Sequence, residues 1–155
     1  MASNTLQGKY TPIHPEKYLG DVDNIVYRSG WERRLMVKLD ISPQVIQWGS
    51  EELIIPYFDS MQRKTRRYFV DFVVLFKTSD GTKKKLAIEV KPYSQTIPPK
   101  LNSSAKKKAN AQRRYLREST TYQNNMDKWR AAEDWCNKNG FYFLVLHEKN
   151  VGGLF

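Results

Sequence analysis

The sequence predicts an α/β fold in which helices flank a mixed central sheet. A helical pattern comes first, strand-sized apolar segments follow it, and two further helical patterns precede a last apolar strand. This order is typical of a sheet covered by helices, and a hairpin combined with a strand after a helix makes the sheet mixed. A chain of 155 residues suits a single domain with its own core.

The N-terminal segment is expected to be irregular. Residues 1–27 contain Pro12 and Pro15, which break regular structure, so we predict an arm lying on the domain. The domain itself is expected over residues 28–148, and residues 149–155 form a C-terminal tail.

The first helix is predicted from Ser29 to Asp40. Trp31, Leu35 and Leu39 recur at helical spacing, and Ser29 is a suitable N-cap. Short strands are expected next over residues 45–48 and 52–57. Pro56 interrupts the second of them, which favours a strand at the edge of the sheet or the end of a strand.

The strongest strand signal lies between Arg67 and Lys77, which is dense in Phe, Val and Tyr. The turn signal Ser79-Asp80-Gly81 follows, and then a strand over residues 86–91. The sequence therefore predicts a hairpin of two antiparallel strands.

Two helices and a strand complete the predicted fold. A very basic helix is expected over residues 103–118, a second helix over 121–139, and a fully buried strand over 141–146. Gly140 is a suitable C-terminal stop for the second helix.

Composition narrows the function classes. The formal net charge of +10 gathers in short basic runs, which favours nucleic acid as the partner. No apolar stretch is long enough for a membrane span, and no signal peptide is visible. The single cysteine, Cys136, excludes an internal disulfide and fits a reducing cytoplasm. With two histidines, a metal would need carboxylate ligands, which suit Mg²⁺ or Mn²⁺.

Two strands of the predicted hairpin carry charged side chains in apolar surroundings. Asp71 lies inside an apolar strand, where an ionised carboxylate is costly unless it is paired or binds a metal. Glu89 and Lys91 share one face of the next strand. Two carboxylates and a lysine could therefore converge, as metal-assisted phosphodiester hydrolysis requires. The alternatives are a buried salt bridge at Asp71 and an ordinary ion pair between Glu89 and Lys91.

Glu32 is a candidate fourth member of this group. It lies on the helical face of Leu35 and Leu39, which points its carboxylate towards the interior. The alternative is structural, because Ser29 and Glu32 also form a capping box.

The pattern of Asp71 followed by Ile88-Glu89-Val90-Lys91 resembles the PD-(D/E)XK nuclease superfamily. Five segments between Lys17 and Pro99 together are similar to those of tailed-phage head-completion nucleases: residues 27–32, 48–51, 55–57, 66–71 and 88–92. The last third of the chain is similar only in its helix-helix-strand outline.

This resemblance implies a restriction-endonuclease-like fold and magnesium-dependent DNA cleavage, with Mn²⁺ able to replace Mg²⁺. It implies Asp71 and Glu89 as metal ligands, Glu32 as a further ligand and Lys91 as the catalytic lysine. It also implies a role at the phage head before tail joining, in the host cytoplasm or the virion head, with portal or head proteins as possible partners.

Further residues are candidates for substrate contacts. We expect DNA-backbone contacts without sequence reading from the basic residues near the site: Arg63, Lys64, Arg66, Arg67, Lys106, Lys107, Lys108, Arg113, Arg114 and Arg117. A solvated charged face is the alternative for some of them. Gln95 and Gln123 are candidates for contacts with substrate or water.

Two other functions remain open from the sequence. One is a structural head-completion protein that binds DNA without cutting it, and the other is an RNA-binding module. The basic helix permits the latter, but no aromatic ribonucleoprotein motif supports it. The sequence does not determine the oligomeric state.

Overall fold

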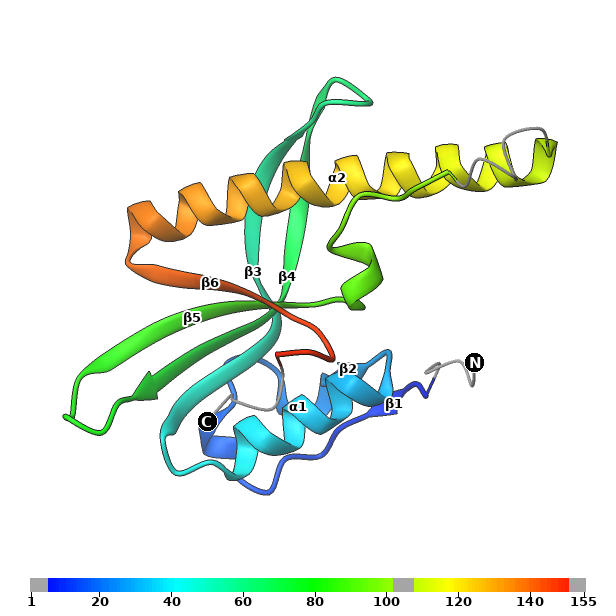
Figure 1. Ribbon diagram of the computed structural model, residues 1–155. Helices are drawn as coiled ribbons and strands as arrows, with labels where there is room; N and C mark the ends of the chain where they lie inside the picture. The colour runs from blue at the N-terminus through cyan, green and yellow to red at the C-terminus, as the bar shows by residue number, and fades with distance from the viewer. Residues whose placement is uncertain (1–5, 102–107, 151–155) are drawn as a thin grey trace.

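The computed structural model describes residues 6–101 and 108–150. A mixed four-stranded sheet lies between two helices (Figure 1). Its strand order is β3-β4-β5-β6, in which β5 and β6 are parallel and the other neighbours are antiparallel. The strands are β3 (Val45–Asp59), β4 (Lys64–Lys77), β5 (Lys83–Val90) and β6 (Phe141–Leu146). The predicted fold class and the β4–β5 hairpin are confirmed.

The first helix, α1 (Gly30–Ile41), begins where the sequence predicts. The Ser29 hydroxyl accepts a hydrogen bond from the Glu32 backbone N–H at 3.1 Å. The helix buries Leu35 and Leu39 against the sheet, so the spacing of apolar residues predicted its inner face correctly.

The second helix, α2 (Ala109–Asn139), replaces the two helices predicted over 103–118 and 121–139. Residues 119–121 do not interrupt the helix. The Thr120 hydroxyl donates a hydrogen bond to the Leu116 carbonyl one turn earlier, so this polar side chain has its partner within the helix. Residues 102–107, the start of the first predicted helix, lie outside the described residues. Gly140 ends α2 at φ 75°, as predicted.

The strand β3 replaces the two short strands predicted over 45–48 and 52–57. Two register shifts, between Val45 and Gln47 and between Ser50 and Leu53, accommodate the extra residues without ending the strand. β3 is an edge strand, as Pro56 indicated, because a proline lacks the N–H that a central strand needs.

The N-terminal segment contains short elements: β1 (Gly8–Lys9), η1 (Pro15–Lys17), η2 (Val22–Asn24) and β2 (Val26–Tyr27), with β1 pairing β2. The buried Asp40 of α1 holds this segment on the domain. Its carboxylate accepts hydrogen bonds from the Tyr10 hydroxyl and from the backbone N–H groups of Ile13 and His14.

Two apolar clusters cover opposite faces of the sheet. On β5, Leu86 and Ile88 face α1, whereas Ala87 faces α2. β6 shares both clusters, but Tyr142 is 57% exposed, so the prediction of a fully buried strand is wrong. β6 is an edge strand, and only part of it is covered by α2. Within the described residues, no helix combines the length and the apolar character of a membrane span.

The bulge in β3 changes which helix its neighbour β4 faces. Phe72 and Val74 pack in the cluster of α1, whereas Tyr68 and Val70, on the same side of the strand, pack in the cluster of α2. Bulges increase local twist, and here the register shift lies opposite the change. The end of the β3–β4 hairpin therefore turns across α2 and rises beyond the sheet (Figure 1).

Candidate active site

Asp71 and Glu89 meet where β4 and β5 begin to diverge. The last paired residues are Phe72 and Ile88, and one further step of the same register sets Asp71 opposite Glu89. Opposite residues of antiparallel strands project to the same face. Asp71 Oδ2 accepts a hydrogen bond from the Val90 backbone N–H at 2.8 Å, which fixes the carboxylate against the end of β5.

Glu89 is anchored by two partners, although its side chain belongs to one of the most polar residue types. It is 4% exposed. The Tyr68 hydroxyl donates to Oε2 at 2.5 Å, and Lys91 Nζ lies 3.5 Å from Oε1. Hydrogen bonds of this kind to a charged group are among the stronger ones in proteins. The ion pair with Lys91 is thus present, and both carboxylates and the lysine are brought together.

The electrostatics of Asp71 reflect this crowding. Burial raises the pKa of Asp71 well above its usual 3.8, and the charge of Glu89 raises it further. The Val90 N–H and the charge of Lys91 act in the opposite direction. The neighbouring carboxylate therefore disfavours ionisation of Asp71, and a bound cation would offset that cost.

The position of Glu32 supports its capping role. Its Oε2 accepts a hydrogen bond from the Arg28 backbone N–H at 2.8 Å, while its own N–H donates to the Ser29 hydroxyl. Its negative charge also raises the pKa of Asp71. Yet within residues 6–101 and 108–150 no three His, Cys, Asp or Glu side chains are close enough to form a metal-binding group. The role of Glu32 as a metal ligand stays a prediction.

The bulge of β3 brings a further acidic residue to the site. Ser50 pairs with Phe72 and Leu53 with Val70, so Glu51 lies in the unpaired stretch beside Asp71. Glu51 has φ 57°, a left-handed conformation that is uncommon outside glycine. Its carboxylate accepts a hydrogen bond from Arg28 Nη1 at 2.7 Å, which neutralises its charge.

Lys128 of α2 is a second cation at the site, and sequence reasoning missed it. Its Nζ lies 5.9 Å from the ring centre of Tyr57 and 5.6 Å from that of Tyr68. Burial lowers the pKa of Lys128, the neighbouring Lys91 lowers it further, and Glu89 opposes both. The sequence feature that could have revealed Lys128 is its place in the helix, one turn before the buried Ala132 and on the face of α2 that packs against the sheet.

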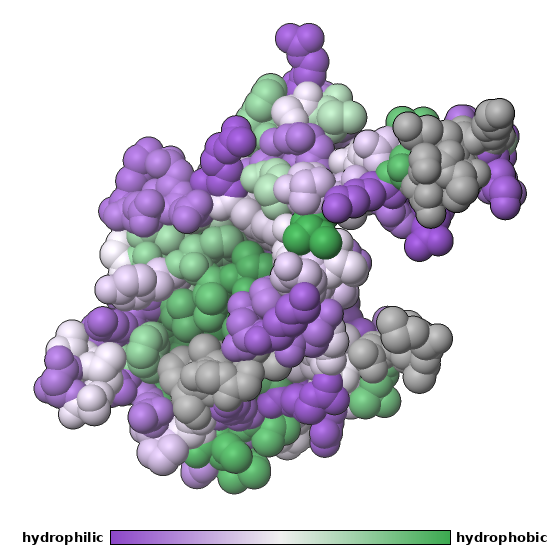
Figure 2. Space-filling view, viewed as in Figure 1, coloured by the Kyte–Doolittle hydropathy of each residue, from purple (hydrophilic) through white to green (hydrophobic). Residues whose placement is uncertain are grey.

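The predicted DNA-binding residues fall into two groups. Arg63, Lys64, Arg66 and Arg67 lie at the end of the β3–β4 hairpin, where Figure 2 shows hydrophilic residues at the tip. Of these, Arg66 is paired with Asp59 at 3.0 Å. Lys108, Arg113, Arg114 and Arg117 are exposed in the first half of α2 and at its N-cap, and Arg114 pairs with Glu118. Lys106 and Lys107 lie outside the described residues.

The two predicted glutamines are in different surroundings. Gln95 ends the short helix η3 (Tyr93–Gln95) and lines an open groove of about 430 Å³, together with Arg114, Arg117 and Tyr122 of α2. Gln123 Nε2 donates to Asp127 Oδ1 at 3.0 Å, and Asp127 in turn accepts from Ser60 at the hairpin turn. Gln95 thus faces a space that a substrate could enter, whereas Gln123 is bonded to Asp127, the residue that joins α2 to the hairpin.

A mixed sheet between two helices, with acidic residues and a lysine gathered where two of its strands diverge, is consistent with the restriction-endonuclease-like fold. The chain belongs to the family described as the TnsA-like endonuclease N-terminal domain, whose model matches residues 42–148. That range includes Asp71, Glu89, Lys91 and Lys128, and begins after Glu32. The chain is also 40% identical, over 151 residues, to the head completion nuclease of Enterobacteria phage T4, covering 95% of this chain and 94% of that protein.

Proposed function

We propose that this protein is a DNA endonuclease that depends on a divalent metal and acts in phage head completion. The observation that carries the proposal is the meeting of Asp71, Glu89 and Lys91 at the end of two adjacent strands. The family supports hydrolysis of nucleic acid, and the name of the phage T4 relative supports the stage of infection.

The residues present fit a divalent cation, with Mg²⁺ proposed and Mn²⁺ as a substitute. Asp71 and Glu89 would hold it, and a cation beside them would offset the burial and the charge of Glu89 that raise the pKa of Asp71. Mg²⁺ commonly binds through one or two carboxylates together with water and substrate phosphate, so a third protein ligand is not required. Glu32 is the candidate for a third protein ligand. When bound, the ion would activate water and neutralise phosphate charge.

The protein's own groups have distinct roles in this proposal. The Lys91 ammonium, held beside Glu89, stabilises negative charge that develops on the phosphate. Lys128 contributes a second, partly desolvated positive charge from α2. The Tyr68 hydroxyl fixes the orientation of Glu89 and so acts as a positioning group.

Substrate binding is proposed to be largely independent of base sequence. The exposed basic residues of the hairpin and of α2 can contact phosphates, which carry no sequence information. Gln95 is proposed to contact the substrate from the groove beside α2. The protein would act in the infected host's cytoplasm or at the phage head, where portal or other head proteins are the candidate partners.

The test is plasmid cleavage with Mg²⁺, Mn²⁺ or a chelator. We expect nicking or linearisation that requires the metal and is lost in Lys91→Ala. Lys138→Ala is the matched control, because Lys138 is also ion-paired, with Asp134 at 3.0 Å, but lies near the far end of α2. Cleavage that survives Lys91→Ala would refute the assignment of the site. Salt-sensitive DNA binding without any cleavage would favour the non-catalytic structural protein.

A further inference from the structure

The end of the β3–β4 hairpin forms a two-stranded arm, residues 53–70, and no other strand of the described residues pairs with it. Pairing of β4 with β5 stops at Phe72, so from there to the turn β3 is the only strand that pairs with β4 in the part of the chain that the structure describes. The inner side of the arm is covered, because Ile55, Tyr57, Tyr68 and Val70 pack with α2.

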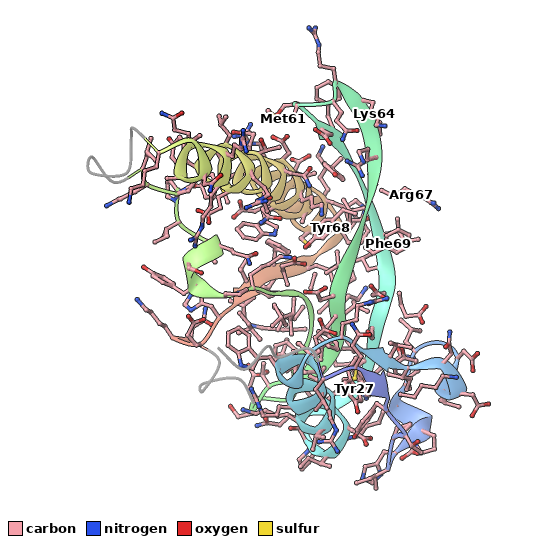
Figure 3. The ribbon with its side chains drawn as sticks, turned by 90° about the vertical axis from the view of Figure 1, so that its right-hand side faces the viewer. Tyr27, Met61, Lys64, Arg67, Tyr68 and Phe69 are labelled. Atoms are coloured by element: carbon pink, nitrogen blue, oxygen red, sulfur yellow. The ribbon has the colours of Figure 1, made fainter. Side chains whose placement is uncertain are left out.

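The outer side of the arm is apolar and exposed. Ile54 pairs with Phe69, and Phe58 pairs with Thr65 further along. Ile54 is 44% exposed, Phe58 57% and Phe69 42%. Figure 3 shows Phe69 and Arg67 on the side of the arm away from α2, and Tyr68 turned towards it. Contiguous apolar side chains left in water usually mark a binding surface.

The charges of the arm indicate what this surface binds. The arm carries four basic residues and a single acidic one, Asp59, whose carboxylate is already bonded to Arg66. The Arg67 guanidinium lies 5.5 Å from the ring centre of Phe69. Exposed aromatic rings flanked by cations match the surface of a nucleic-acid strand, which offers flat bases and phosphates together.

The arm is also continuous with the candidate active site. Phe69 and Asp71 are two residues apart on β4, about 7 Å along the strand. Because β4 twists between Val70 and Phe72, Phe69 points away from α2, whereas Asp71 lies opposite Glu89. Thr65, the residue paired with Phe58, lies about 20 Å from Asp71 along β4, at about 3.3 Å per residue. The outer face of the arm therefore ends close to Asp71 along β4.

We propose that the outer face of the arm binds unpaired bases, with Phe58 and Phe69 stacking on them and Lys64 and Arg67 contacting the backbone. This inference rests on the proposed function for its DNA substrate and makes it more specific. The preferred DNA would contain a single-stranded segment, such as a gap, a flap or a frayed end.

The experiment measures binding in the presence of a chelator, so that it does not depend on cleavage. The probes are labelled oligothymidylate, an abasic oligonucleotide of the same length, and a matched duplex. The intact protein should bind oligothymidylate more tightly than the abasic strand, which keeps the phosphates but lacks the bases. Replacing Phe58 and Phe69 together with Leu should weaken oligothymidylate binding by about fivefold or more for each lost stacking contact and leave the abasic strand unaffected.

Two control variants make the result decisive. Leu keeps the surface apolar, whereas replacing both residues with Tyr keeps the rings and should preserve binding. Tyr142→Ala removes an exposed aromatic that also has a lysine, Lys84, over its ring at 5.3 Å, but lies on β6; it should have no effect. Equal binding of the two single strands by the intact protein would overturn the proposal, as would full oligothymidylate binding by the Leu variant. A dimer that the Leu variant converts to monomer would overturn it in favour of self-association.

The proposed nuclease activity is tested separately in this design. Base-dependent binding without metal-dependent cleavage would refute the enzyme and support the arm. Metal-dependent cleavage by a protein that binds oligothymidylate and the abasic strand equally would support the enzyme and refute the proposed role of the arm.

Discussion

Replacing Tyr68 with Phe removes a single oxygen and should disturb both stability and cleavage. The hydroxyl donates to Glu89 Oε2, and Glu89 is 4% exposed, so water has little access to replace it. A hydrogen bond to a charged group contributes about 1.5–3 kcal/mol. Because Phe fills the same space, no cavity adds to that loss.

Tyr57→Phe is the matched control. Tyr57 is equally buried and also lies under Lys128, but its hydroxyl donates to the neutral Asn124 Oδ1 at 3.0 Å. That bond contributes about 0.5–1.5 kcal/mol and does not involve Glu89.

Urea unfolding in a chelator measures the first effect. With a slope near 2 kcal/mol/M, a loss of about 2 kcal/mol lowers the midpoint by about 1 M. Plasmid cleavage measures the second, and loss of a group that orients a metal ligand should lower the rate about 10- to 100-fold. If Tyr68→Phe unfolds at the same urea concentration as Tyr57→Phe and cleaves at the original rate, Glu89 is not held as described.

Three further predictions follow from the buried titratable groups. Because the pKa of Asp71 is raised, folding favours its protonated form; the stability this contributes is complete below about pH 4 and is lost as the pH rises through the folded pKa. Asp71→Asn, unfolded by heat in a chelator, should therefore show a flatter pH profile and a higher Tm at neutral pH, and parallel profiles would contradict this. Lys128→Met keeps the buried stem without its desolvated charge, so stability should be unchanged or higher while plasmid cleavage falls roughly a hundredfold; unaltered cleavage would remove Lys128 from the site. Burial raises the pKa of Cys136 to about 11, so a thiol reagent at pH 8 should label the native protein far more slowly than the urea-unfolded chain, and equal rates would show that this part of α2 opens readily.

The parts of the fold that local chemistry determines were predictable. The density of Phe, Val and Tyr around Asp71, the turn signal at 79–81 and the strand signal that follows it were enough to predict two adjacent strands, and the structure confirms that hairpin. Capping by Ser29 and Gly140 was equally visible, because each acts through its own hydrogen bonds or backbone conformation.

The parts that depend on distant contacts were not predictable. Lys128 reaches the site only because α2 crosses strands more than fifty residues earlier in the chain, and its surroundings come from Tyr57 and Tyr68. The bulge at Glu51 gives no local sign either, since glutamate rarely adopts a positive φ. The continuity of α2 through residues 119–121 was also missed, although the Thr120 hydroxyl bonds within the helix.

The register of β3 has a consequence for how this protein can vary. From Asp59 and Lys64 inward to Leu53 and Val70, each step of the hairpin is an unbroken pair, and only the turn at 60–63 closes it. Inserting one residue into each strand beside the turn would lengthen its reach and leave every existing partner in place. One residue added to a single strand would instead turn its side chains over from the insertion onward. Relatives with a longer or shorter β3–β4 hairpin could therefore share an unchanged catalytic site.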